Sequence, residues 1–376
     1  MSAADRSIRG RWRWALAGLG VALLCWLGWG LAVVRPARAP RPAPPAGELR
    51  GAWHVHTTRS DGLGTLDEVL KAARAAGLQF VVVTDHNVLA PEDAGWHDGV
   101  LVIEASEASS RFGHVVAVGL PRVLTLEERG GEPLEAIAAL GGEAVLAHPF
   151  HARRPWSGWE RAPWRGIEVV SNDTSWGEIT VGRGWGRILP GLLALPFDAA
   201  RTVVDLVPAT HREEAVLDAA PRPDQPRARR QDGSPAPPRV LLCSADAHGY
   251  PSYQAAFEAF SMHVPVRASG DAAADARAVL AALLDGRATC VFDGVAPASN
   301  LRLAPDPRGR MLLTGDGAFE GAEALLWRGG AVVGSARGAT GGFGFDCPGG
   351  CGPGIYRAVA TRGGRPWLFT NPVVIE

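Results

Sequence analysis

The sequence predicts an α/β domain, preceded by an apolar helix and followed by a small antiparallel β-sandwich. From Arg50 onward, apolar runs typical of buried strands alternate with segments of helical pattern. After about residue 298, short alternating runs are broken by glycine pairs. Ahead of both regions lies an uncharged apolar run, Ala15 to Val34. The 376 residues suffice for one large domain and a smaller one.

The N-terminal region predicts a membrane segment. A basic segment, residues 1–14, precedes the apolar run of residues 15–34, which is long enough to cross a bilayer. Residues 35–47 are rich in Pro and Ala and predict an extended tether. We expect an uncleaved single-pass anchor in the cytoplasmic membrane. A cleaved signal peptide is the alternative, because Ala37-Arg38-Ala39 resembles a cleavage site.

The arginines ahead of the apolar run favour an N-terminus inside the cell. The body would then lie on the periplasmic or extracellular side of the membrane. After signal cleavage it would be periplasmic or secreted. The formal net charge of -1 gives no electrostatic basis for binding nucleic acid.

The cysteines give a weaker indication of location. Cys243 and Cys290 lie in strand-like apolar runs and are expected to be small core residues. Cys347 and Cys351, in "CPGGC", could close a short disulfide loop, which would suit an oxidising compartment.

The predicted α/β domain covers residues 48–297. Its apolar strand patterns occur at residues 49–56, 78–87, 99–107, 113–120, 143–150, 166–170 and 239–249. Thr65 and Glu68 form a capping box for a helix that stops at Gly77. Further helices are predicted at residues 132–140, 185–207 and 271–286. An insertion at about 155–238 ends in a polar, Pro- and Arg-rich stretch, residues 209–238, which predicts a loop.

The C-terminal region, residues 298–376, is predicted to be the β-sandwich. Its short apolar runs alternate with "RGG" and "GG" turns, which is typical of antiparallel strands joined by tight connections.

Histidines and acidic residues recur where the apolar strands end. They are His54, His56, Asp85, His86, Glu107, His148, Asp246 and His248. In a β/α barrel, the carboxyl ends of the strands converge on one mouth. Imidazoles and carboxylates that converge there are suitable ligands for divalent transition metals. Each motif alone could be structural, but their joint occurrence at strand ends favours a metal site.

The order of the motifs resembles that of the PHP (polymerase and histidinol phosphatase) metallohydrolases. These motifs are "HVHTTRSDG", "TDHN", a glutamate seven residues before His114, "HP" and "DAHG". The closest similarity is to the carbaryl-hydrolase-like subgroup. This resemblance implies a distorted (β/α)7 barrel that holds two or three divalent ions, which would be Zn, Mn or Fe.

The resemblance also implies a ligand set. The first metal would be held by His54, His56 and Asp246, with Glu107 bridging to a second. His148 and His114 would complete the second site, and Asp61, His86 and His248 would form the third. Glu104 competes with Glu107 for the bridging role, but the spacing to His114 favours Glu107. Asp85 is expected to orient a ligand imidazole.

The implied activity is that of a metal-dependent phosphoesterase acting on a small anionic substrate. Paired cations would lower the pKa of a bridging water and neutralise charge on a phosphoryl oxygen. Glu107, His114, Asp85 and Arg111 are the catalytic candidates, and Arg111 and His114 could hold an anionic group or protonate the leaving oxygen. Arg153 and Arg154 are either phosphate contacts or solvated loop charges.

Two other functions remain open at this point. The same metal site could hydrolyse a carbamate, amide or carboxylic ester. The chain could instead be a non-catalytic metal-binding module of the cell envelope. The motifs supply water activation for either hydrolysis, so they do not choose between the substrates, and the oligomeric state is left open.

Overall fold

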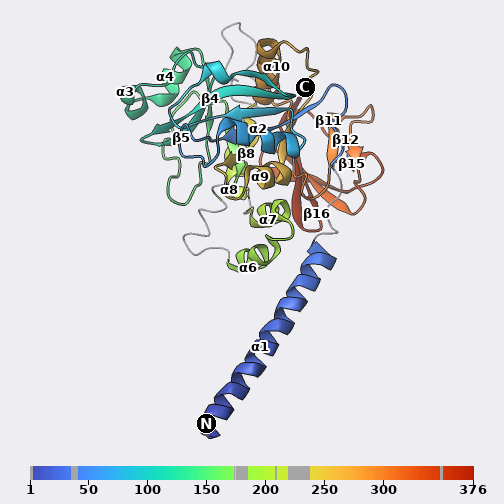
Figure 1. Cartoon of the computed structure of the whole chain (residues 1–376). Coiled ribbons are helices and arrows are strands. Elements are labelled where there is room, and N and C mark those ends of the chain that lie inside the picture. Colours follow the sequence, from blue (N-terminus) through green and yellow to red (C-terminus); the bar gives the residue numbers. More distant parts are fainter. Residues whose placement is uncertain are drawn as a thin grey trace.

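The structure is a computed structural model that describes residues 3–34, 41–172, 174, 185–207, 210–218, 238–347 and 350–376. Residues 35–40 of the predicted tether lie outside this description, as does a large part of the predicted insertion. A long N-terminal helix extends from a body in which helices and strands are mixed (Figure 1).

Seven strands close a barrel, which confirms the α/β class. In order around it they are β1 (Leu49–Val55), β2 (Phe80–Val83), β4 (Val100–Ser110), β5 (Gly113–Val118), β6 (Glu143–Leu146), β7 (Gly166–Ser171) and β8 (Val240–Ala247), which pairs back with β1. The pairs are parallel except for the two that involve β5. Because β4 and β5 form a hairpin, β5 runs against the other strands.

Helices follow several of the strands and cover the barrel. They are α2 (Leu66–Ala75), α3 (Leu126–Gly130), α4 (Pro133–Ala139), α9 (Tyr253–Ala259) and α10 (Ala272–Leu284), with a 3₁₀ turn η3 (Pro91–Asp93) and a short strand β3 (Gly95–His97) beside β4. The capping box predicted for α2 is present, because Thr65 accepts from the amide of Glu68 and Glu68 accepts from the amide of Thr65. Gly77 then takes a φ of +72°, which ends the helix at low steric cost.

The segment between β7 and β8 differs from the prediction. The single helical stretch expected at residues 185–207 is two helices, α6 (Trp185–Ala194) and α7 (Ala199–Leu206). Pro196 lies at the break, and Asp198 caps α7 by accepting from the amide of Arg201.

The predicted loop at residues 209–238 contains a third helix, α8 (His211–Asp218). Its polar composition suggested a loop, but two of its acids bind the buried Arg357. The guanidinium lies 2.6 Å from Asp218 Oδ2 and also pairs with Glu214. Residues 219–237 lie outside the described residues.

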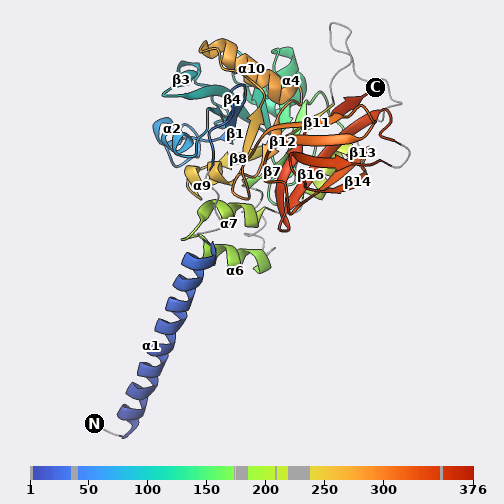
Figure 2. The ribbon, with the colours of Figure 1, turned by 90° about the vertical axis from the view of Figure 1, so that its right-hand side faces the viewer.

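The C-terminal strands form two antiparallel layers around a shared core (Figure 2). One layer contains β11 (Ala298–Pro305), β12 (Met311–Gly317) and β15 (Gly342–Phe345). The other contains β13 (Ala322–Arg328), β14 (Ala331–Arg337), β16 (Gly354–Arg362), β17 (Arg365–Thr370) and β18 (Val373–Ile375). The second layer continues into the barrel, because β17 pairs with β10 (Thr289–Val291), β10 with β9 (Ser261–Val264), and β9 with β1. The two regions therefore share one continuous sheet.

Two disulfides join four of the five described cysteines, and Cys25 is free. Cys347 and Cys351 are paired, as the short loop allowed. Cys243 and Cys290 are buried, but they are also bonded to each other, which corrects the expectation of simple core residues. The fold brings β8 and β10 together at a Cα–Cα distance of 5.9 Å, within the range a disulfide needs.

The N-terminal helix α1 (Ala3–Trp29) continues as a π-helical turn η1 (Gly30–Val34). Trp14–Val34 has a mean hydropathy of 2.0 and is mostly exposed. By length and composition it could cross a membrane or serve as a signal sequence. Together with the two disulfides, this helix indicates a location outside the cytoplasm.

Candidate metal centre

Nine residues from six strands and their connections converge at one end of the barrel. They are His54, His56 and Asp61 from β1 and its loop, His86 after β2, Glu107 on β4, His114 on β5, His148 after β6, and Asp246 and His248 at the end of β8. His114 stands at the start of β5, because that strand runs in the opposite direction. The beginning of β5 therefore lies beside the ends of the five other strands that supply these residues.

Glu107 lies at the centre of this cluster and is buried. Each of its carboxylate oxygens faces imidazole nitrogens. Oε2 lies 3.1–3.2 Å from nitrogens of His54, His56 and His86. Oε1 lies 2.8 Å from Nδ1 of His114 and 3.0 Å from Nε2 of His148. One carboxylate therefore faces two separate groups of potential ligands.

The first group consists of His54, His56 and Asp246, all of which are buried. The two Nε2 atoms lie 2.9 Å apart, and Oδ1 of Asp246 lies 3.5 and 3.6 Å from them. Regular alternation along a strand would place both imidazoles on one face. The two imidazoles do lie together, although the pairing register of β1 shifts between Ala52 and Val55.

Three of the clustered residues have left-handed backbone conformations. The φ angles are +69° at His54, +26° at His148 and +39° at Asp246. Non-glycine residues seldom adopt this conformation, and a fold that retains it commonly does so at a functional site. Here each such residue ends a barrel strand and aims its side chain at the cluster.

The second group contains His86, Glu107 and His114, and His148 contacts the same Glu107 oxygen as His114. The resemblance implied His148 and His114 for this group. The structure adds His86, whose Nδ1 faces Glu107 while its Nε2 lies 3.5 Å from Asp61.

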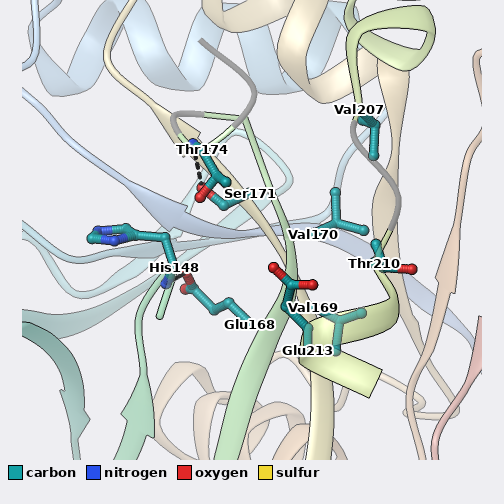
Figure 3. A pocket seen from close by; sticks show the side chains of 9 residues that line it. All are labelled: His148, Glu168, Val169, Val170, Ser171, Thr174, Val207, Thr210 and Glu213. Atoms are coloured by element: carbon teal, nitrogen blue, oxygen red, sulfur yellow. Dashed lines mark hydrogen bonds between the residues drawn. The ribbon is translucent and has the colours of Figure 1, made fainter. Parts of the chain in front are cut away.

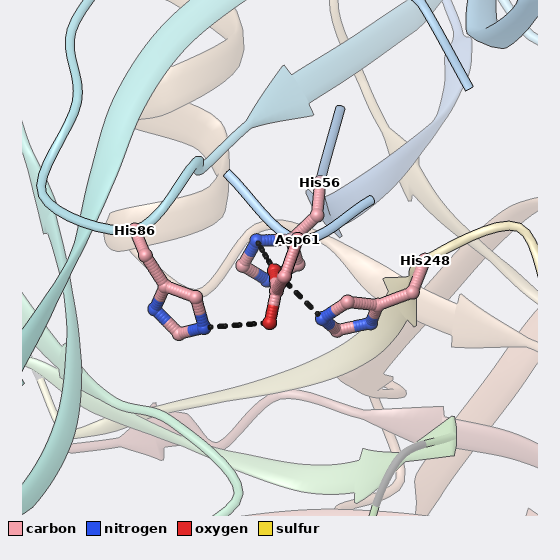
Figure 4. Close-up of side chains that lie close together, drawn as sticks. All are labelled: His56, Asp61, His86 and His248. Atoms are coloured by element: carbon pink, nitrogen blue, oxygen red, sulfur yellow. Dashed lines mark ion pairs between the residues drawn. The ribbon is translucent and has the colours of Figure 1, made fainter. Parts of the chain in front are cut away.

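The third group lies nearer to solvent and is drawn in Figure 4. Asp61, which is 57 % exposed, is surrounded by three imidazoles. Its carboxylate oxygens lie 3.3 Å from His248 Nε2, 3.5 Å from His86 Nε2 and 3.6 Å from His56 Nδ1. His56 and His86 therefore each present one ring nitrogen to this group and the other to a deeper one.

Arg111 is not brought to the cluster. Its guanidinium lies 4.5 Å from the Phe112 ring centroid, and its Nη2 lies 3.9 Å from Glu132 Oε1. The side chain is exposed on the turn after β4, where a nearby carboxylate and an aromatic face hold it. A role for Arg111 at the reacting group stays a prediction.

Asp85 is connected to an imidazole through Ser60. It accepts from the amide of Thr57 at 2.8 Å and from the hydroxyl of Ser60. Ser60 in turn lies 3.3 Å from Nδ1 of His56. Asp85 therefore fixes the loop after β1 and does not bind an imidazole directly. Glu104, the competitor of Glu107, accepts instead from the amide of Ala90.

Glu168, on β7, is a member of the site that the sequence motifs did not indicate. It is buried and lies 2.7 Å from Nδ1 of His54, and it accepts from the indole of Trp53 and the amide of His148. A proton held on Nδ1 of His54 leaves Nε2 free to bind a metal. The acid in "GIEVV" was the available signal, since a charge seldom interrupts a buried strand.

Glu168 and His148 also line a small cavity between β7 and the α8 region (Figure 3). Its volume of about 10 Å³ suits a single water. Thr210 and Glu213 close the far side, so the segment between β7 and β8 extends to the back of the cluster.

The electrostatics of the cluster follow from its crowding. Burial lowers the pKa of His54, but the carboxylates of Glu168, Asp246 and Glu107 outweigh it and hold the pKa well above its usual range. Burial raises the pKa of Glu107, yet the surrounding imidazoles bring it well below its usual range. The imidazoles of His248 and His86 lower the pKa of Asp61 in the same way. The negative charges of these carboxylates are stabilised by positive charges nearby, which protons on the imidazoles or bound metal ions can supply.

The donor set fits divalent metals. Imidazole nitrogens and carboxylate oxygens converge in three groups, and within each group the atoms lie within 4.8 Å of one another. The described residues therefore form several candidate metal sites that share ligands.

Comparisons with known proteins found similarity to solved structures alone. No protein-family model and no curated protein matches the chain. A solved two-domain protein from Bacteroides vulgatus, containing a predicted PHP-like metal-dependent phosphoesterase, is 13% identical over 90% of this chain and 99% of its own, with a TM-score of 0.37. An amidohydrolase from Chromobacterium violaceum is 15% identical over 35% of this chain and 84% of its own, with a TM-score of 0.24. Both similarities are weak, since the identities are 13% and 15% and the TM-scores are 0.37 and 0.24.

Proposed function

We propose that this chain is a metal-dependent phosphoesterase of the PHP type, acting on a small phosphate ester. The observation that carries the proposal is Glu107, whose two oxygens face separate groups of imidazoles. A shared carboxylate of this kind suits two cations held close together. Such an arrangement is more than a structural ion pair requires.

The three groups described above would hold the metals. Divalent ions bound there would lower the pKa of a coordinated water and neutralise charge on the phosphoryl oxygens. Glu168 would keep His54 oriented through Nδ1, and Asp85 would hold the loop that carries Ser60 and Asp61. Exposure rises from the buried Glu107 to Asp61, so substrate would enter on the side of Asp61 and His248.

A cationic side chain beside the cluster favours phosphate over the other substrates. Nη1 of Arg154 lies 3.4 Å from Nε2 of His114, and the Arg154 side chain reaches this position from an exposed loop. A guanidinium binds phosphate oxygens through paired hydrogen bonds, whereas a neutral carbamate or carboxylic ester offers it less. Arg154 therefore replaces Arg111 as the candidate for holding the anionic group.

A substrate panel tests this proposal. The full-length chain, purified in detergent, would be supplied with Zn or Mn and offered phosphomonoesters, phosphodiesters, aryl esters and aryl carbamates. We expect metal-dependent release of phosphate. Arg154→Gln should slow the phosphate reaction by about 10- to 100-fold, and the matched variant Arg153→Gln should not.

Other outcomes of the panel would point elsewhere. Turnover of esters or carbamates alone, unaffected by Arg154→Gln, would identify the second hydrolase chemistry. Bound metal without any turnover would favour the non-catalytic envelope module. Either result would overturn the phosphoesterase proposal.

A further inference from the structure

The helix α6 is apolar after Arg187. Residues 188–197, "ILPGLLALPF", contain no charged or polar side chain. One face packs on α7, where Gly191 accepts a hydrogen bond from Thr202 and lies close to Leu206. The opposite face is exposed and carries Leu189, Leu192 and Leu193, which are 59%, 43% and 45% exposed.

Such a face is unusual on a helix at the surface of a protein. A surface helix normally turns polar residues outward, and a helix that is apolar all round is covered by protein or by lipid. The neighbouring α7 differs, since it carries a charged pair, Arg201 and Asp205, whose side chains are 25% and 27% exposed. The exposed leucines of α6 therefore call for a cover.

The end of the apolar N-terminal helix lies directly beside α6. The indole of Trp26 donates to the carbonyl oxygen of Leu193 at 3.0 Å, and its ring meets Phe197 edge to face at 5.1 Å. Both views show α6 beside the body end of α1 and at an angle to it (Figures 1 and 2). On η1, Leu31 and Val33 are also exposed. The apolar surface of α1 thus continues onto α6.

A second attachment fixes the chain that follows the apolar segment. Nη2 of Arg41 lies 3.0 Å from Asp293 in a buried ion pair. The same guanidinium donates to the carbonyl oxygens of Ala76 and Phe257. With α1 held against α6 at one point and Arg41 held on the barrel at another, the body has a defined orientation relative to the helix.

We propose that α6 lies in the surface layer of the same bilayer that α1 spans, with Leu189, Leu192 and Leu193 in contact with the lipid chains. The inference rests on the membrane span of α1, which is part of the expected location. An apolar helix that lies beside the end of a spanning helix, at an angle to it, has the geometry of an interfacial helix. Lipid is the occupant because the exposed leucines continue the surface that α1 itself presents to the bilayer.

Lipid quenching of a fluorescent label tests this position. In a Cys25→Ser background, Leu192→Cys would be labelled with an NBD fluorophore, since the other cysteines are paired. The full chain would be reconstituted in phosphatidylcholine vesicles with or without doxyl-labelled lipid. Val332→Cys, on β14, is the matched control, because Val332 is 47% exposed and Leu192 is 43% exposed. Leu19→Cys reports on the span itself.

The labels at residues 192 and 19 should both show blue-shifted emission, and doxyl-labelled lipid should quench this emission. The label at residue 332 should keep a water-like emission that the lipid does not quench. Quenching at 19 with water-like emission at 192 would overturn the proposal for α6 alone. Blue-shifted emission at 192 without lipid quenching would mean that a protein surface covers the leucines, which also contradicts it. Absence of quenching at both positions would overturn the membrane span as well.

Discussion

Two buried clusters of histidines and carboxylates lie in this molecule, and they differ in how charge is arranged. In the cluster around Glu107, several imidazoles crowd the same oxygens, and His54 and His56 approach each other to 2.9 Å. In the second cluster, His263 lies between Glu48 and Asp293, with Nδ1 at 2.9 Å from Glu48 Oε1 and Nε2 at 3.6 Å from Asp293 Oδ1. Arginines also pair with Asp293.

The difference distinguishes a candidate metal site from a structural network. In the second cluster, Asp293 pairs with Arg41 and Arg50, whose cationic side chains cannot ligate a metal. In the other cluster, the two oxygens of Glu107 face imidazole nitrogens of five histidines, and imidazoles can ligate a metal. A buried histidine is therefore informative only together with the groups that surround it.

The largest expected effect compares one variant from each cluster. The double variant His54→Ala with Asp246→Ala should lose bound metal and lower activity by more than about 100-fold, since outer partners of metal ligands alone cost 10- to 100-fold. His263→Gln should keep both metal and activity. Metal analysis and phosphate-release assays on the three proteins measure this. Equal loss in both variants would remove the distinction between the clusters.

Glu168→Gln should give the next largest effect. A neutral amide holds His54 less firmly, so we expect metal affinity to fall by about 10- to 100-fold while the fold persists. Competition with a chelator measures the affinity. Glu104→Gln is the matched control on β4, because Glu104 contacts none of the imidazoles in the described structure. Unchanged affinity in Glu168→Gln would show that Glu168 only supports packing.

Metal binding should release protons. Burial lowers the pKa of His148, but Glu107 outweighs it and raises the pKa to about 9. Burial likewise lowers the pKa of His248, but Asp61 and Asp246 outweigh it and raise that pKa to about 9. At pH 7.5 both imidazoles of the metal-free protein therefore carry protons, which a metal must displace. Calorimetry in two buffers of different ionisation enthalpy should show proton release, and affinity should rise with pH. A pH-independent affinity would contradict this.

The second cluster should instead affect stability. Burial lowers the pKa of His263, but Asp293 and Glu48 outweigh it and hold the pKa above its ordinary 6.5. The stabilisation by protonated His263 is then fully present below pH 6.5 and is lost as pH rises through the folded pKa. The wild type should exceed His263→Gln in melting temperature more at pH 6 than at pH 9. A difference that grows with pH would reverse the sign and refute it.

Much of the arrangement could be predicted from the sequence, because the strand ends of a barrel meet at one mouth. This rule places His54, His86 and Asp246 in a single cluster without any knowledge of their contacts. Glu168 was missed because one acid in an apolar strand has no motif of its own. The disulfide between Cys243 and Cys290 was also missed, because no motif links two cysteines that lie in separate apolar runs.

The remaining differences depend on which segments meet in space. The polar pattern of α8 suggested a loop. Two acids of this helix pair with Arg357, which is distant in the sequence and lies beside them only in the folded chain. Arg111 and Arg154 each lie a few residues from a candidate ligand histidine in the sequence, and only the fold shows that Arg154 approaches His114. Long-range pairings of this kind leave no periodic trace in the sequence.

The metal content of the wild type and of Glu107→Gln tests the central claim most directly. If Glu107 joins two groups of ligands, the wild-type chain should bind two or three divalent ions. Removal of one carboxylate charge should then weaken at least two of them together. Fewer than one metal per wild-type chain, or a Glu107→Gln protein with unchanged metal content, would contradict a shared metal centre.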